Sequence, residues 1–159
     1  MRISAKTDYA VRGVAELASL QAEWPATAER VAQAQDIPLN FLENILVQLR
    51  HAGIVDSRRG PDGGYLLARP AEDIAVADVI RAIDGPLAGV SGERPETLEY
   101  SGAAAPLRET WIAVRASLRA VLEQVTLADL VTGDLPEHVR ELTSDPDAWE
   151  TRLTGPRPG

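Results

Sequence analysis

Apolar residues recur at three- and four-residue intervals through most of the chain, which is the spacing of an amphipathic α-helix. The pattern predicts five main helices, over residues 4–20, 28–35, 39–52, 76–84 and 107–125. Between the third and fourth helices it predicts two short strands, 54–58 and 65–69. Three glycines and one proline fall in the six residues that join them, a composition that suits an extended hairpin loop. We therefore expect a mainly α fold with one small β-hairpin.

The helix predicted at 39–52 has two contrasting faces. Leu42, Ile45, Leu46 and Leu49 share the apolar face, and polar side chains occupy the other. A shorter helix precedes it across a turn at 36–38, and the hairpin with its arginines follows it directly. This is the element order of a winged helix-turn-helix domain, which places one helix in the DNA major groove and a basic loop beside it.

The side chains of this region define the expected contacts to double-stranded DNA. Asn and Gln amides can read adenine, the Glu43 carboxylate can accept from a cytosine amine, and Arg59 can enter a minor groove. Glycines at the loop end would permit close approach to the DNA backbone. For Glu43 a solvated helix face is an equally good interpretation. The predicted DNA contacts are Ser4, Lys6, Arg12, Asn40, Glu43, Asn44, Gln48, Arg50, His51, Arg58, Arg59, Gly63 and Gly64.

Overall charge changes this interpretation only in part. The chain has 159 residues, 45% of them hydrophobic and 25% charged, and a net charge of −8. Such acidity argues against indiscriminate binding to nucleic acid. The basic residues of the first half are grouped, however, so a local positive patch favours sequence-selective binding. The alternative is that these charges are scattered and only solvate the surface.

The helix predicted at 107–125 has a narrower apolar stripe. Its apolar residues follow alternating four- and three-residue steps, which is a heptad seam rather than a broad face for a globular core. We expect this seam to join two copies of the chain, and the alternative is a helix folded back on its own domain. The predicted dimer contacts are Leu107, Trp111, Val114, Leu118, Val121 and Val125.

These elements suggest four segments. Residues 1–85 would form the DNA-binding domain, 86–106 a connector poor in periodicity, and 107–131 the dimerisation helix with a short following helix. Residues 132–159 would form a tail with two small helices starting near 134 and 145, disordered at 154–159. No apolar stretch approaches a membrane span and the start does not resemble a signal peptide, so we expect a cytoplasmic protein.

Catalytic and metal chemistry find little support in the sequence. There is no cysteine, which excludes disulfides, thiolate metal sites and cysteine nucleophiles. The two histidines, His51 and His138, are far apart, and no phosphate-binding loop or hydrolase motif is present. We expect no enzyme activity, no metal and no cofactor.

Five stretches resemble the Rrf2 family of bacterial winged-helix regulators: MRISAKTDYAVRGVAELA, LNFLENILVQLRHAGIV, SRRGPDGGYLLARP, IAVADVIRAIDGP and VTLADL. The resemblance covers about residues 1–86 and 107–131. It implies a homodimer crossed through the long helix that binds an imperfect palindrome. By position it implies that Asn40, Glu43 and Asn44 face bases and that Arg59 occupies the minor groove.

The connector departs from this resemblance. Many members of the family hold an iron–sulfur cluster through three cysteines there, and LAGVSGERPETLEYSGAAAP has neither Cys nor His. The chain thus resembles a cluster-free branch, in which regulation comes from a partner protein, a small ligand or protein abundance. Asp62 stands where glycine is common, and Pro38 where a capping serine is common.

The leading hypothesis is a homodimeric, sequence-specific DNA-binding repressor, and two further hypotheses accompany it. A winged helix can also serve as a protein–protein interaction module, which the overall acidity favours and the two wing arginines oppose; steep salt dependence would indicate DNA binding. A ligand-sensing regulator with a pocket near Trp111 and the 86–106 connector is compatible with DNA binding. Trp111 is more often a core or interface residue than a ligand platform.

Overall fold

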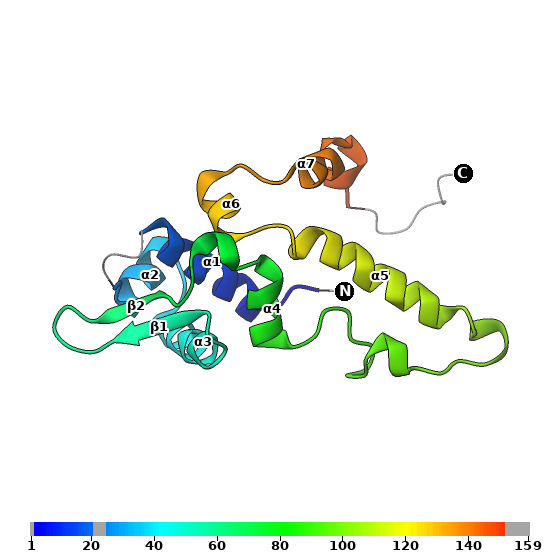
Figure 1. The fold of residues 1–159 in the computed structure, drawn as a ribbon, viewed down its shortest axis with the longest axis horizontal. Helices are drawn as coiled ribbons and strands as arrows, with labels where there is room; N and C mark the ends of the chain where they lie inside the picture. The colour runs from blue at the N-terminus through cyan, green and yellow to red at the C-terminus, as the bar shows by residue number, and fades with distance from the viewer. Residues whose placement is uncertain (1, 21–24, 152–159) are drawn as a thin grey trace.

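A computed structural model of the chain describes residues 2–20 and 25–151. Figure 1 shows a cluster of helices with a β-hairpin at one end of the long axis and a projecting helix, α5, toward the other. The prediction of a mainly α fold with one hairpin is confirmed. In chain order the elements are α1 (Ala5–Ser19), α2 (Ala28–Gln35), α3 (Leu39–His51), β1 (Val55–Arg58), β2 (Gly64–Leu67), α4 (Val76–Asp84), α5 (Leu107–Leu122), α6 (Leu127–Thr132) and α7 (Glu137–Ser144).

The first helices begin where the sequence places capping side chains. The Ser4 hydroxyl accepts a hydrogen bond from the Thr7 amide, and the Thr27 hydroxyl accepts one from the Arg30 amide. Each cap satisfies an amide that has no partner inside its own helix. Asp36 then adopts the left-handed conformation, with φ of 51°, and ends α2. The turn that results separates α2 from α3, in the order of a helix-turn-helix.

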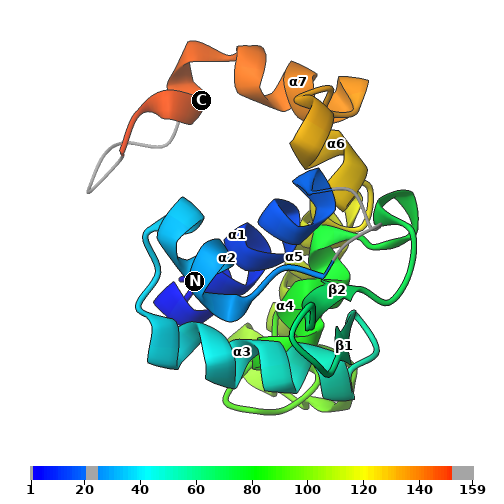
Figure 2. The same cartoon turned by 90° about the vertical axis from the view of Figure 1, so that its left-hand side faces the viewer.

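The core lies where α1, α2, α3 and α4 meet (Figure 2). The predicted apolar face of α3 supplies its centre, because Leu42, Ile45, Leu46 and Leu49 are all fully buried. Burial of each such side chain contributes about 1.5–3 kcal/mol. The polar face of α3 must therefore point outward.

The hairpin forms the predicted wing. Strands β1 and β2 are antiparallel, with Val55 opposite Leu67 and Arg58 opposite Gly64. The second strand begins one residue earlier than predicted, because Gly64 pairs with Arg58, and it ends at Leu67 instead of 69. On its other edge the Ala26 amide donates to the Tyr65 carbonyl at 2.8 Å, and the Tyr65 amide donates to the Ala26 carbonyl at 2.7 Å. The wing is thus hydrogen-bonded to the segment that leads into α2.

The chain returns to the first domain after α5. Ala75 and Thr126 form an antiparallel bridge, in which the Val76 amide donates to Val125 at 2.9 Å and the Leu127 amide donates to Ile74 at 2.9 Å. Leu127 is fully buried in the same core as α1. α6 therefore packs on α1, and residues beyond the boundary predicted at 85 contribute to the core of the first domain.

Helix α5 projects from this domain and has no buried residue. A helix folded back on its own core would have several, so the structure does not favour that alternative. α5 ends at Leu122 rather than at the predicted residue 125. The two small helices predicted beyond it are confirmed, as α7 and a 3₁₀ turn at Pro146–Trp149. The disorder predicted at 154–159 falls outside the described residues. Over the described part of the chain, no helix has the length and apolar character needed to cross a membrane.

Candidate nucleic-acid interface

The outward face of α3 is polar and largely unpaired. Asn40, Glu43 and Asn44 are exposed, and the Asn44 side chain donates to the Asn40 carbonyl at 2.9 Å. Glu43 has no ion-pair partner among the described residues. His51 is exposed at the last position of the helix. Spacing of three and four residues puts these side chains on one side of α3, where they can reach base edges in a major groove.

Helix α1 contributes a cation to the same face. The Lys6 ammonium donates to the Gln48 side chain at 3.0 Å, which brings together two predicted DNA contacts from different helices. Between α1 and α3 lies an open groove of about 380 Å³, whose lining includes Lys6, Asn44 and Gln48. Phe41 also lines this groove and remains 56% exposed. Phe41 was not among the predicted DNA contacts, although an aromatic residue between the polar positions Asn40 and Glu43 is visible in the sequence.

The wing arginines are accessible. Arg58 and Arg59 are both exposed, and neither makes an ion pair within the described part of the chain. Arg50, at the end of α3, donates to the Ser57 hydroxyl at 3.2 Å. This hydrogen bond connects the end of the proposed recognition helix to the first wing strand. Figure 2 shows α3 and the wing on the same side of the molecule.

Arg12 and Ser4, both predicted as DNA contacts, have partners within the chain. The Arg12 guanidinium donates to the Gln35 carbonyl at the end of α2, pairs with Asp8 at 3.1 Å and lies over the Tyr9 ring. It therefore holds α1 against α2, because the last carbonyls of a helix need donors. The Ser4 hydroxyl caps α1 and lies 3.5 Å from the Asp84 carboxylate. Both side chains are occupied by intramolecular partners.

Gly63 and Gly64 also have a different role from the predicted one. A Cβ on Gly63 would lie 2.3 Å from the Arg58 carbonyl oxygen, and a Cβ on Gly64 would lie 2.5 Å from the Ala26 carbonyl oxygen. The close approach that requires glycine is thus made to the protein's own backbone.

The residues of the predicted dimer seam lie mostly along α5, and their pairing with a second copy stays a prediction. Val114, Leu118 and Val121 line an open groove of about 550 Å³, and Leu142 of α7, 58% exposed, lies on its other side. Leu107 is half-buried at the start of the same helix. Val125 requires correction: it lies beyond the end of α5, is buried, and accepts a backbone hydrogen bond from Val76. It belongs to the core of its own subunit.

Trp111 lies within this seam and leaves its polar atom without a partner. The ring is half-buried, and its Nε1 is shielded from solvent with no acceptor among the described residues. An indole N–H in such a place ordinarily has a hydrogen-bond partner. This orphaned donor favours a surface that is completed by another molecule over a finished core.

Known proteins resemble this chain over nearly its whole length. A family described as "Iron-dependent Transcriptional regulator" (Rrf2) matches residues 3–133. A Mycobacterium tuberculosis protein, Rv1287, whose name assigns it provisionally to the HTH-type transcriptional regulators, is 48% identical over 155 residues, covering 98% of this chain and 96% of its own. The HTH-type transcriptional regulator CymR of Bacillus subtilis is 36% identical over 132 residues, covering 83% of this chain and 91% of its own.

Solved structures show the same relationship. The structure of B. subtilis CymR, described as the global cysteine regulator, has a TM-score of 0.71 and 34% identity, covering 84% of this chain and 98% of that one. T. potens IscR has a TM-score of 0.68 and 30% identity, covering 89% of this chain and 96% of that one.

The iron named in the family description does not fit the donors of this chain. The sequence has no cysteine. Across residues 2–20 and 25–151, no three His, Asp or Glu side chains are grouped closely enough to hold a metal ion. Iron–sulfur clusters are held mainly by cysteine thiolates, and this chain has none to supply.

Proposed function

The chain belongs to the Rrf2 family of transcriptional regulators, and on that premise we propose that it is a homodimeric repressor that binds an imperfect palindrome without an iron–sulfur cluster. It is a DNA-binding transcriptional regulator, as the family and the CymR and IscR relatives indicate. The observation that carries the finer proposal is the separation of two surfaces: the unpaired polar face of α3 with the wing arginines, and the open apolar groove of α5.

The proposed DNA contacts follow from which side chains remain available. Asn40, Glu43, Asn44 and Gln48 would meet base edges, with Lys6 held beside them by its hydrogen bond to Gln48. Arg58 and Arg59 would contact the backbone and adjacent minor groove. Arg50 and His51, at the end of α3, would contact the DNA backbone beside the wing. This arrangement accommodates the net charge of −8, because the cations are local to the contact surface.

A second copy of the chain is the occupant that we propose for the α5 groove. Val114, Leu118 and Val121 repeat at coiled-coil spacing, and a symmetric partner would present the same residues in return. Two-fold symmetry would then place one α3 in each of two successive major grooves. Occupancy of such an operator would exclude other proteins from those grooves, and this is the proposed basis of repression.

Replacing Arg59 by alanine should weaken operator binding by about 1–3 kcal/mol. It should also reduce by about one the slope of the logarithm of the binding constant against the logarithm of the salt concentration. The reason is that Arg59 is exposed at the wing tip and has no ion pair in the described chain. Fluorescence anisotropy across a range of salt concentrations measures both quantities. Arg59→Lys should recover the salt dependence but not the full affinity. Arg140→Ala on α7 is the matched control, and equal losses in the two alanine variants would refute the role of Arg59.

Replacing Glu43 by alanine should relax sequence choice more than it changes affinity, with about 1–3 kcal/mol of discrimination lost at one position of each half-site. In vitro selection with the wild-type protein should return an imperfect palindrome, and the variant should tolerate other bases at one symmetric pair of positions. Glu137→Ala, which removes an exposed carboxylate from α7, should keep the wild-type consensus. An unchanged consensus for Glu43→Ala would show that Glu43 reads no base, and a single asymmetric site would argue against the dimer.

A further inference from the structure

A cavity of about 320 Å³ lies between the end of α4, the connector and α5. α4 belongs to the DNA-binding domain, and α5 is the proposed dimer helix, so the cavity touches both. Its volume is at the lower end of the range for small-molecule sites. Pro86, Leu87 and Pro95 supply apolar wall, and four arginines supply the charge: Arg81, Arg94, Arg115 and Arg119.

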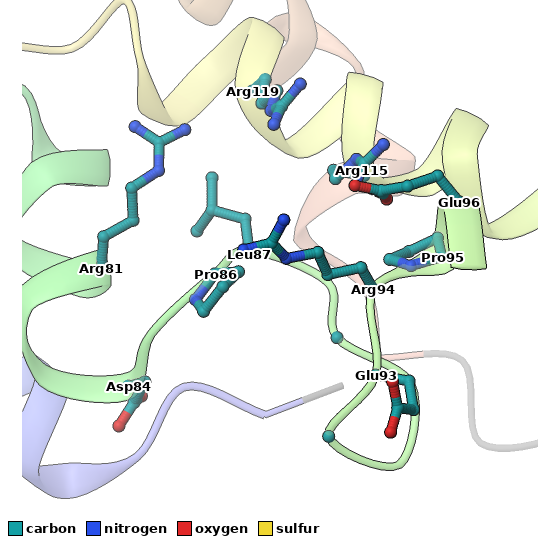
Figure 3. A pocket seen from close by; sticks show the side chains of 12 residues that line it. Arg81, Asp84, Pro86, Leu87, Glu93, Arg94, Pro95, Glu96, Arg115 and Arg119 are labelled. Carbon is teal, nitrogen blue, oxygen red and sulfur yellow. Dashed lines mark hydrogen bonds and ion pairs between the residues drawn. The ribbon is translucent and has the colours of Figure 1, made fainter. Parts of the chain in front are cut away.

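Of the acidic residues that line the cavity, only Glu96 is paired with one of these four arginines. Asp84 accepts a hydrogen bond from the Thr7 hydroxyl, which belongs to α1. Figure 3 shows the side chains of Asp84 and Glu93 directed away from α5. Glu96 is paired with Arg115 at 2.5 Å. A backbone hydrogen bond and this Arg115 contact hold the pKa of Glu96 below its usual value, which favours the ionised form that pairs with Arg115.

Arg94 is the cation that lacks a direct partner. Its guanidinium makes no hydrogen bond or ion pair with the rest of the described chain, although it is near enough to Glu96 to favour the charged form of that carboxylate. In Figure 3 its side chain extends from the connector toward the middle of the cavity. Arg81 and Arg119 approach from the two flanking helices, and both are paired with Glu123, Arg119 at 3.7 Å.

We propose that this cavity binds a small organic dianion, with Arg94 as the principal contact and Arg81 and Arg119 as the second cationic side. Guanidinium groups bind carboxylate and phosphate through paired N–H donors, and two opposed cationic groups suit a ligand charged at both ends or doubly charged at one. The apolar wall around Leu87 accommodates a short carbon skeleton. Dicarboxylates and phosphate monoesters share this chemistry.

Binding would couple the cavity to DNA recognition. Glu123 joins Arg81 of α4 to Arg119 of α5, so an anion that competes for these arginines loosens the link between the two helices. A ligand can shift the equilibrium between the linked and the loosened arrangement of α4 and α5 only if it binds one of them more tightly than the other. This regulatory step rests on the proposed function, whereas dianion binding itself does not.

Isothermal titration calorimetry with the purified full chain, in the absence of DNA, tests the site directly. Succinate and glycerol 3-phosphate are the two dianionic probes, and succinamide is the neutral control. We expect saturable binding of at least one dianion, none of succinamide, and at least tenfold weaker binding by Arg94→Gln. Arg140→Gln, on α7 and outside the cavity, should bind as the wild type does. Circular dichroism confirms that each variant is folded.

Absence of binding by both dianions, or equal binding by Arg94→Gln and wild type, would overturn the proposed site. Preference for one probe assigns the ligand to the dicarboxylate or the phosphate class. A second titration measures operator binding with and without the bound probe. Binding to DNA that the probe leaves unchanged would overturn the regulatory step. A chain that binds the probe but no DNA would instead overturn the proposed function.

Discussion

Replacing Leu118 by glutamate should turn the proposed dimer into monomers and remove most operator binding. Leu118 lies in the middle of the open α5 groove, with Val114 and Val121 on either side. A carboxylate there would be desolvated against the same residue of the partner, with no cation in the seam to pair with it. Loss of a central interface residue of this kind weakens the free energy of dimerisation by about 2–4 kcal/mol, which raises the dimer dissociation constant by roughly 30- to 1,000-fold.

Analytical ultracentrifugation measures the dimer constant, and anisotropy with the selected operator measures the consequence for DNA binding. Ala116→Glu is the matched control, because it adds the same charge to an exposed position on another face of α5. It should remain dimeric. A Leu118→Glu variant that stays dimeric and binds the operator normally would remove α5 as the dimer contact.

Replacing Gly64 by alanine should destabilise the folded state by about 2–4 kcal/mol and displace the wing. The new Cβ would lie 2.5 Å from the Ala26 carbonyl oxygen and 3.1 Å from the Thr27 nitrogen, which are backbone atoms that cannot rotate away. The backbone at Gly64, with φ of 151°, adds conformational strain. For a chain of this length the loss corresponds to a fall in Tm of about 2–4 °C per kcal/mol.

Thermal and urea unfolding check this expectation, and Gly60→Ala provides the comparison. Gly60 also has a positive φ, of 110°, but a Cβ there would meet nothing within 4 Å. It should therefore show only the conformational cost. If the two variants were equally stable, the contact between β2 and the Ala26 segment would contribute nothing to the wing.

Local pattern was sufficient to predict the elements of the first domain. The four leucine and isoleucine positions of α3 are fully buried as predicted, and Ser4 and Thr27 cap the helices that they precede. These features depend on neighbours three or four residues away, so they can be read from spacing alone. The contact that Arg12 makes within the chain could not be predicted, for the opposite reason. Its partner, the Gln35 carbonyl, is distant in sequence, and a guanidinium satisfies a helix end as readily as a phosphate.

The packing of α6 on the first domain has a counterpart in the sequence. Ile74-Ala75-Val76-Ala77-Asp78 and Val125-Thr126-Leu127-Ala128-Asp129 have the same pattern, and in each the aspartate accepts a hydrogen bond from the amide three residues earlier. The two segments form the antiparallel bridge between Ala75 and Thr126. Matching patterns of this kind predict similar helix starts, but they do not indicate that the two starts are paired.

By itself the sequence determined the order of helices and wing, the polar and apolar faces of α3, and the lack of any thiolate for a metal, because these follow from residue identity and short-range spacing. Only the tertiary structure decided which cations are available to a ligand and which are already paired. Arg59 and Arg94 have guanidinium groups available to a ligand, whereas the Arg12 guanidinium is already paired. The reason is that pairing depends on which distant segments the core brings together, and the bridges at Ala26 and Thr126 form only when the chain is folded.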